Sequence, residues 1–347
     1  SISNFDGAKT SWTYSVPVAA SWEVDIFSRL TNAKRRSHAA LLQSEAYRDA
    51  VQTQLIANVA VYYYRLLSLD AQMTVTKQAV ERYREQRRVM QALKAAGGAN
   101  EAGIAQTEAM LYAAETTLHD LQYSIRQTEN SLTLLLGDTL NTIERSTLEA
   151  QSVPMELAVG IPLQLLSRRP DIRQKEQALV QAYYATAEAH ATLYPSLTLS
   201  GSAGWTNSAG AIVANPGKLL FSAAGSLLQP IFNAGQNRSR IKIAKAQQEE
   251  AKLAFQQALL NAGAEVNNAL TQVQTARSKT DTRRKQLRSL ERAVKSTQLL
   301  MLHGSTTYLE VLTAQQTLLD ARLSAIADRL SELQGVVSLY HALGGGI

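Results

Sequence analysis

Two stretches of the chain alternate strictly between apolar residues and polar or small ones. From Trp12 to Val24 every even position is apolar, whereas the odd positions carry Ser, Thr, Pro, Ala or Glu. Pro195–Trp205 alternates in the same way, and its second face is almost entirely hydroxylated. A period of two predicts β-strands with one apolar face. A third, weaker alternation follows at about 218–230. The predicted strands therefore cover about 11–25, 194–206 and 218–230.

Tryptophans mark the apolar faces of these strands. Trp12 and Trp22 lie ten residues apart on one face. At about 3.3 Å per residue and a tilt near 40°, this spacing covers about 25 Å, the height of a lipid-facing band bordered by aromatic girdles. The spacing favours lipid over a protein core, and the hydroxylated face of the second strand suits a water-filled lumen. The predicted lipid-interface aromatics are Trp12, Trp22 and Trp205.

Much of the remaining chain has heptad spacing. Apolar residues recur at intervals of three and four at 255–276 and 309–340, which predicts long helices packed side by side. Ala244, Ala251 and Ala258 add a second stripe of small residues, so this helix can pack against two neighbours and take part in a ring. The predicted helical ranges are about 34–137, 236–303 and 306–342.

The two halves of the sequence repeat each other. At a constant offset of 205 residues, Ser21, Phe27, Asn32 and Arg35 recur as Ser226, Phe232, Asn237 and Arg240. Each half follows the plan of strand, long helix, glycine-containing turn and returning helix. We therefore expect a first repeat at 1–137, a linker or equatorial segment at 138–167, and a second repeat at 168–347.

Composition argues against several functional classes. The 347 residues include no cysteine, which excludes disulfides and thiolate metal sites, and the five histidines are far apart. The net charge is +6, but the basic residues are interleaved with acids, as on solvated helix faces and unlike a nucleic-acid-binding stripe. Phosphate-binding, dinucleotide-binding and nucleophile-elbow motifs are missing from the sequence. We expect a protein that is not an enzyme and has no cofactor, bound metal or nucleic-acid partner.

Four separated motifs follow one another along almost the whole chain. They are SWEVDIF at 21–27, LLSRRPDIR at 165–173, LYPSLTLSG at 193–201 and ALGGG at 342–346. In this order they resemble the TolC/OprM outer-membrane efflux family, especially its NodT-type branch of RND efflux outer-membrane lipoproteins. Within the second motif, Arg168, Arg169, Asp171 and Arg173 are expected to pair helices or protomers.

The resemblance implies a fold that is mainly α with a membrane β-barrel. Each protomer of a homotrimer would give four strands to one shared twelve-stranded barrel in the bacterial outer membrane, and its coiled-coil-like helices to a long periplasmic α-barrel. The family normally has another helix and strand before Trp12, and many members carry a lipidated N-terminal cysteine. We therefore expect an N-terminally truncated fragment.

The function implied by the resemblance is passive. The protein would be the exit duct of a tripartite efflux or export pump, as in multidrug resistance. A periplasmic adaptor, an inner-membrane pump commonly of the RND type, and outer-membrane lipid would be its partners. A periplasmic or surface coiled-coil scaffold or adhesin without a pore is the alternative. It would explain the heptads, but not alternating strands with tryptophans ten residues apart.

The same resemblance suggests functional residues at the ends of the long helices. Glu310 and Thr313 match positions where family members often ring the periplasmic gate with aspartates, and a threefold carboxylate ring would favour cations. Glu310 could equally be an ordinary exposed helix residue. The expected adaptor contacts are the hairpin tips, although glycines there also suit helix ends. These tip residues are Gly98, Ala99, Asn100, Gly304, Ser305 and Thr306.

Overall fold

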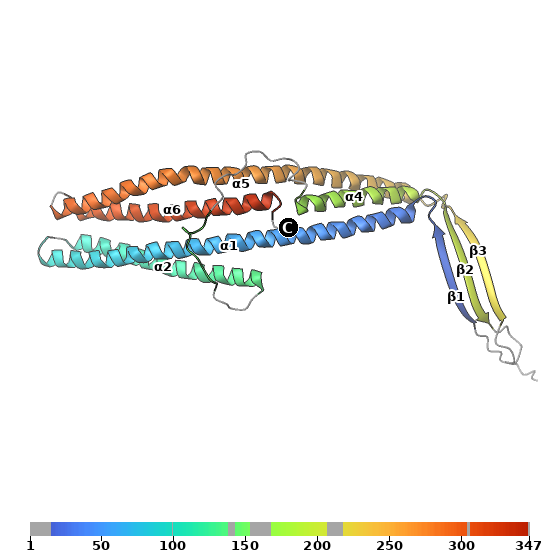
Figure 1. Ribbon diagram of the computed structural model, residues 1–347, viewed down its shortest axis with the longest axis horizontal. Helices are drawn as coiled ribbons and strands as arrows, with labels where there is room; N and C mark the ends of the chain where they lie inside the picture. The colour runs from blue at the N-terminus through green and yellow to red at the C-terminus, as the bar shows by residue number, and fades with distance from the viewer. Residues whose placement is uncertain are drawn as a thin grey trace, which may run out of the picture. The chain divides into compact units, whose positions relative to one another are not determined.

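The structure is a computed structural model that describes residues 15–98, 100–137, 143–152, 168–206, 218–303 and 306–345. Its helices and strands follow the predicted pattern of a mainly helical chain with short strands (Figure 1). In chain order they are β1 (Ser15–Val24), α1 (Arg29–Ala95), α2 (Glu101–Leu136), α4 (Pro170–Ala191), β2 (Ser196–Thr206), β3 (Lys218–Leu228), α5 (Gln236–Leu302) and α6 (Tyr308–Ala342). The chain divides into two compact units, 1–45 with 174–256 and 46–173 with 257–347.

The first unit contains an antiparallel sheet in the order β1-β2-β3. Trp22 pairs with Leu199, and Leu199 with Gly225, so the apolar positions of the three strands fall on one face. That face holds Val18, Ala20, Trp22, Val24, Leu197, Leu199, Gly201, Ala203, Phe221, Ala223, Gly225 and Leu227. The opposite face is hydroxyl-rich, and Ser202 and Ser222 share a hydrogen bond of 2.7 Å across it. The predicted alternation is therefore confirmed.

The apolar face of this sheet is open to its surroundings. Trp22 is 65% exposed and Phe221 is 77% exposed. None of the described helices has the length and apolar character needed to span a bilayer.

Helix α1 follows β1 closely, five residues before the predicted start near 34. The Asp25 carboxylate accepts hydrogen bonds from the backbone amides of Leu30 (2.9 Å) and Thr31 (2.7 Å). These amides belong to the first helical turn and have no partner within the helix. Asp25 therefore satisfies them and fixes the helix start immediately after the strand.

In the first unit, α4 contacts the beginnings of both long helices. Arg36 of α1 forms an ion pair with Glu188 of α4 at 3.2 Å. On α5, the Ala244 carbonyl oxygen accepts a hydrogen bond of 3.1 Å from the Thr186 hydroxyl of α4. Ala244 is buried, so the small-residue stripe predicted there does form a packing surface at this position.

The second unit is built from two helical hairpins, α1 with α2 and α5 with α6 (Figure 1). The heptad positions predicted for α5 are buried at Ala262, Val266, Ala269, Val273 and Ala276. A Cβ added at Gly335 of α6 would lie 2.8 Å from Val273 Cγ2, so glycine permits the close approach of these two helices.

Helix α6 departs from the single apolar stripe predicted for it. Leu309 and Tyr340, at the two ends of that stripe, are each 56% exposed, and these two predicted packing positions are wrong. Val311, Leu318 and Ala321 are buried instead. The reason is that α6 packs on two sides, against α5 and against the α1–α2 hairpin, and therefore needs a wider apolar surface.

Arg169 joins α4, α5 and the end of α6. Its guanidinium is almost fully buried and donates to the carboxylates of Asp171 and Glu265, each at 2.7 Å from Nη2, and to the Ala342 carbonyl oxygen at 3.1 Å. A Cβ at Gly344, where φ is +80°, would lie 3.3 Å from the Arg169 backbone nitrogen. Two motifs far apart in sequence, LLSRRPDIR and ALGGG, thus meet, and the predicted pairing role is confirmed for Arg169 and Asp171.

The described part of the linker, 143–152, is fixed to both hairpins. Arg145 donates to Asp70 of α1 at 2.9 Å and to Glu129 of α2. Leu148 is 2% exposed and packs in a cluster with residues of α1 and α6. The Gln151 carbonyl oxygen accepts a hydrogen bond from Arg329 of α6. The linker therefore holds the α1–α2 hairpin against α6.

Asp171 should make this network sensitive to acid. Desolvation tends to raise the pKa of Asp171, but the hydrogen bond and charge of Arg169 outweigh it, and the pKa is lowered from its ordinary value of 3.8. A lowered carboxylate pKa contributes stability above the unfolded-state value that is lost as the pH falls through the folded-state value. Asp171→Asn should cost roughly 0.5–1 kcal/mol at pH 7, because the carboxylate is half-exposed.

The difference should vanish at a pH well below 3.8, where the native carboxylate is also protonated. Urea unfolding, followed by the helical circular dichroism signal, measures the difference in stability. An equal difference at both pH values would show that the charge of Asp171 is not the cause.

Candidate functional site

The turn between α1 and α2 forms the tip of the first hairpin. Gly97 has a φ of +77°, and the backbone amide of Gly98 donates to the Leu93 carbonyl oxygen at 2.8 Å, which ends α1. Asn100 begins α2 as its N-cap, since its side-chain oxygen accepts a hydrogen bond of 3.0 Å from the Gly103 amide. An ion pair between Lys94 and Glu101 spans the turn. Ala99 lies outside the described residues.

The second tip precedes α6. Thr307 is the N-cap of this helix, but its side chain makes no capping hydrogen bond. The Thr306 hydroxyl donates to the Glu310 carboxylate, which lies in the first helical turn, where a negative charge is favoured by the helix dipole. Of the predicted tip residues here, Gly304 and Ser305 lie outside the described residues.

A groove of about 660 Å³ lies between the two tips. It brings together three of the predicted tip residues, Gly98, Asn100 and Thr306. Apolar side chains that were not predicted as tip residues also line it, among them Val89, Met90, Leu93, Met301, Leu309 and Leu312. The groove therefore offers an apolar surface with a polar rim.

Tyr308 is a partly buried polar residue that lines this groove. Its hydroxyl oxygen lies 3.5 Å from the Thr107 hydroxyl, and burial raises the pKa of Tyr308. The phenol therefore stays neutral at physiological pH. The sequence alone did not identify Tyr308 as a functional residue, because a tyrosine at the start of a helix is just as often a packing residue.

The predicted gate residues Glu310 and Thr313 are exposed on one face of α6. The same face continues with Thr317 and Asp320, at the spacing of three, four and three residues that keeps side chains on one side of a helix. Asp320 accepts a hydrogen bond of 2.9 Å from Gln316. Glu310 and Thr313 of this polar stripe were predicted from the sequence, whereas Thr317 and Asp320 were not, although their spacing could have revealed them.

Aromatic residues gather where the sheet meets the helices of the first unit. Trp22 is exposed on the apolar face, as predicted, and Trp12 lies outside the described residues. Trp205 lies in β2 in register with Val16 and Leu219. Three further aromatic residues here were not predicted to have a role at this boundary. Phe27 and Tyr194 stack with ring centroids 4.6 Å apart, and Phe232 is exposed. Phe27 and Phe232 are one of the residue pairs related by the sequence repeat.

Across the ranges that the structure describes, no group of three or more His, Asp or Glu side chains is placed to hold a metal ion.

Comparison with known proteins gives a consistent result. A family model described as outer membrane efflux protein matches residues 3–138 and 161–345. The cation efflux system protein CusC of Escherichia coli strain K12 is 28% identical over 97% of this chain and 74% of its own length. The pyoverdine export outer membrane protein OpmQ of Pseudomonas aeruginosa is 30% identical over 96% of the chain and 70% of its own length.

A crystal structure of CusC superposes on this chain with a TM-score of 0.91 at 28% identity, covering 99% of this chain and 80% of the other. These relatives are channel and export proteins, and none supports the coiled-coil scaffold or adhesin alternative.

The first tip yields a direct test of its capping residue. Asn100→Ala should remove the N-cap hydrogen bond and destabilise the first turn of α2 by about 1 kcal/mol, or about fivefold in the local opening equilibrium. Hydrogen exchange of the Gly103 amide measures this effect. The first turn of α6, whose cap residue makes no side-chain bond, is the internal control. Unchanged exchange at Gly103 would contradict the capping role.

Proposed function

Since the chain belongs to the outer membrane efflux protein family, we propose that three copies assemble into one exit duct of a tripartite pump. The protein is an outer-membrane efflux channel with a periplasmic helical domain. Its relatives are named for cations and for pyoverdine, which are chemically unlike. A passive duct accounts for this range, because the choice of cargo can be made by the pump upstream.

The observation that carries the proposal is the open apolar face of the β1-β2-β3 sheet. Lipid suits this face, whereas water penalises it by about 25 cal/mol for each Å² of apolar surface. Within the described strands, β1 and β3 each pair on one side only. A sheet edge cannot stay unpaired in lipid, so strands from further copies would have to close a shared barrel.

The helices support the same assembly. Exposed large apolar side chains lie on α2 and α5, including Tyr123, Leu134, Leu253 and Leu260, and suit contacts between copies in a periplasmic α-barrel. The long helices α1 and α5 have 67 residues each, and the returning helices α2 and α6 have 36 and 35. These lengths support a two-fold internal repeat, with repeats at 1–137 and 168–347 around the linker at 138–167.

We propose that Glu310 and Thr313 face the duct at its periplasmic end. The polar stripe they begin carries hydroxyls and carboxylates and is free of large apolar residues from Glu310 to Asp320, which suits a water-filled lumen better than a contact between copies. A threefold ring of Glu310 carboxylates would attract cations and repel anions. Three copies would place these charges around one narrow opening.

The hairpin tips are the proposed docking site of a periplasmic adaptor. Gly98, Asn100 and Thr306 line the groove there, and its apolar floor suits a protein contact. Ala99, Gly304 and Ser305 belong to the same proposed tip surface. An inner-membrane pump of the RND type would then connect to the duct through the adaptor, and outer-membrane lipid would surround Trp12, Trp22 and Trp205.

Planar-bilayer recording tests the duct and its gate together. The protein extracted from outer membranes in detergent should form trimeric pores that prefer cations. Glu310→Gln should lower the ratio of cation to anion permeability, because the carboxylate ring loses its charge.

Glu101→Gln is the matched control, since Glu101 lies in the first turn of the helix at the other tip and pairs with Lys94. It should leave the permeability ratio unchanged. If Glu310→Gln leaves the permeability ratio unchanged, the gate role of Glu310 is contradicted but the duct function is not. A protein without conductance would contradict the duct function.

A further inference from the structure

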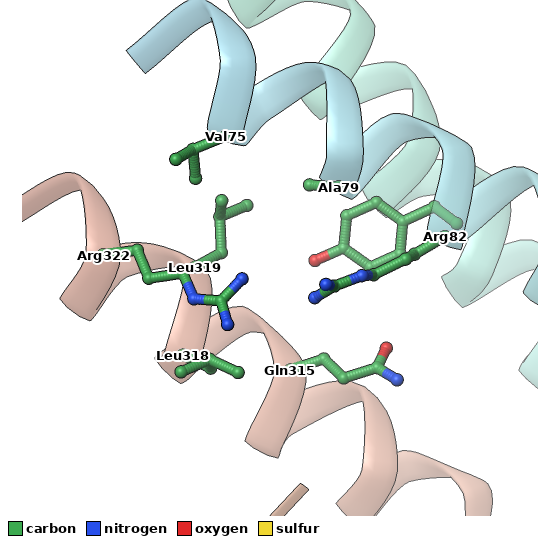
Figure 2. A pocket seen from close by; sticks show the side chains of 8 residues that line it. Val75, Ala79, Arg82, Gln315, Leu318, Leu319 and Arg322 are labelled. Atoms are coloured by element: carbon green, nitrogen blue, oxygen red, sulfur yellow. The ribbon is translucent and has the colours of Figure 1, made fainter. Parts of the chain in front are cut away.

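Two arginines face each other across a small cleft between α1 and α6. Figure 2 shows the guanidinium groups of Arg82 and Arg322 pointing toward one another from the two helices. Apolar side chains and Gln315 lie beside them in Figure 2, and Tyr83 also lines the cleft. The apolar residues are Val75, Ala79, Leu318 and Leu319. Two like charges turned toward one small space repel each other, unless a negative group lies between them.

Two carboxylates of α1 that are close to Arg82 in the sequence pair with other arginines. Along α1, Glu81 pairs with Arg84 at 2.7 Å and Glu85 with Arg88 at 3.6 Å. Among the residues that the structure describes, no hydrogen bond or ion pair is found between Arg82 and a carboxylate. The exposed Arg82 therefore brings to the cleft a positive charge that has no carboxylate partner in this part of the chain.

Two carboxylates lie near the α6 side of the cleft. Asp320 accepts a hydrogen bond from the neutral amide of Gln316, and its charge contributes, after burial, to the raised pKa of Tyr83. Glu291 of α5 pairs with Arg322 through Nη2 at 3.0 Å. A guanidinium has five N–H donors, so this single bond leaves Arg322 with donors for another partner.

The uncharged groups of the cleft cannot balance the two arginines. The Tyr83 hydroxyl donates to the Gln316 amide oxygen at 3.1 Å, and burial raises the pKa of Tyr83, so the phenol stays neutral. The Gln315 amide oxygen already accepts a hydrogen bond from Gln86. The cleft is therefore rich in donors and poor in free acceptors.

We propose that this cleft binds an oxyanion, held between Arg82 and Arg322. Its volume of about 30 Å³ matches about one water-sized group, so one oxygen would enter and the remainder of the anion would stay in the open groove. Guanidinium groups suit carboxylate and phosphate oxygens because their N–H groups form a planar fork. The anion is either a free phosphate or sulfate, or a carboxylate side chain of a second copy. The inference uses contacts within one chain and does not rest on the proposed gate.

Thermal unfolding of the detergent-solubilised protein tests the site with inorganic phosphate as the probe. Phosphate should raise the unfolding temperature in a saturable way, beyond the effect of sodium chloride at equal ionic strength. Arg82→Gln and Arg322→Gln should each weaken the apparent affinity about tenfold, since each removes one charge-assisted partner. Arg88→Gln is the matched control, because Arg88 lies on the same helix and its ion pair is exposed.

A second measurement identifies the source of the anion. If a carboxylate of another copy fills the cleft, phosphate will have no specific effect on the assembled protein, and Arg82→Glu or Arg322→Glu will release protomers while Arg88→Glu will not. That result also supports an oxyanion site. The proposal is overturned if phosphate acts no differently from chloride and the reversed charges at positions 82 and 322 leave the oligomer as stable as the position 88 control.

Discussion

The open apolar face of the β1-β2-β3 sheet is the constraint on which the remaining structure depends. Small and large apolar residues of three strands line up in register, with Trp22 and Phe221 exposed on this face. In water such a face would invite association, and lipid removes that penalty. Unpaired strand edges are not tolerated in lipid. In the proposed assembly, strands of other copies would therefore have to pair with the edges of this sheet.

The helical part of the chain has a constraint of its own, which is that α6 packs against neighbours on two sides. Gly335 lets α5 approach closely, while Val311, Leu318 and Ala321 widen the buried surface beyond a single heptad stripe. At the end of α6, Arg169 ties the helix to α4 and α5. A buried arginine needs such complete pairing, since an unpartnered charge in the interior costs several kcal/mol. These contacts leave one polar stripe of α6 exposed, which is the stripe assigned to the duct.

Periodicity was sufficient to predict the described strands, the faces of the sheet and the buried positions of α5 from Ala262 to Ala276, because each depends on local spacing. The exposure of Leu309 and Tyr340 could not be predicted in that way, since it depends on which neighbours α6 meets. The cleft between Arg82 and Arg322 was equally hidden, because it joins helices far apart in the sequence. Thr317 and Asp320 could have been found by extending the spacing from Glu310, whereas the direction in which Glu310 points within an assembly depends on other copies.

The placement of the sheet in lipid is tested most directly by spin labels along β1. The chain has no cysteine, so a single cysteine introduced in turn at positions 18 to 22 carries the only label. In outer-membrane vesicles, labels at Val18, Ala20 and Trp22 should be relaxed mainly by oxygen, which concentrates in lipid, and labels at Ala19 and Ser21 mainly by a water-soluble nickel chelate. Equal accessibility to the nickel chelate at all five positions would contradict a membrane-embedded strand and, with it, the duct.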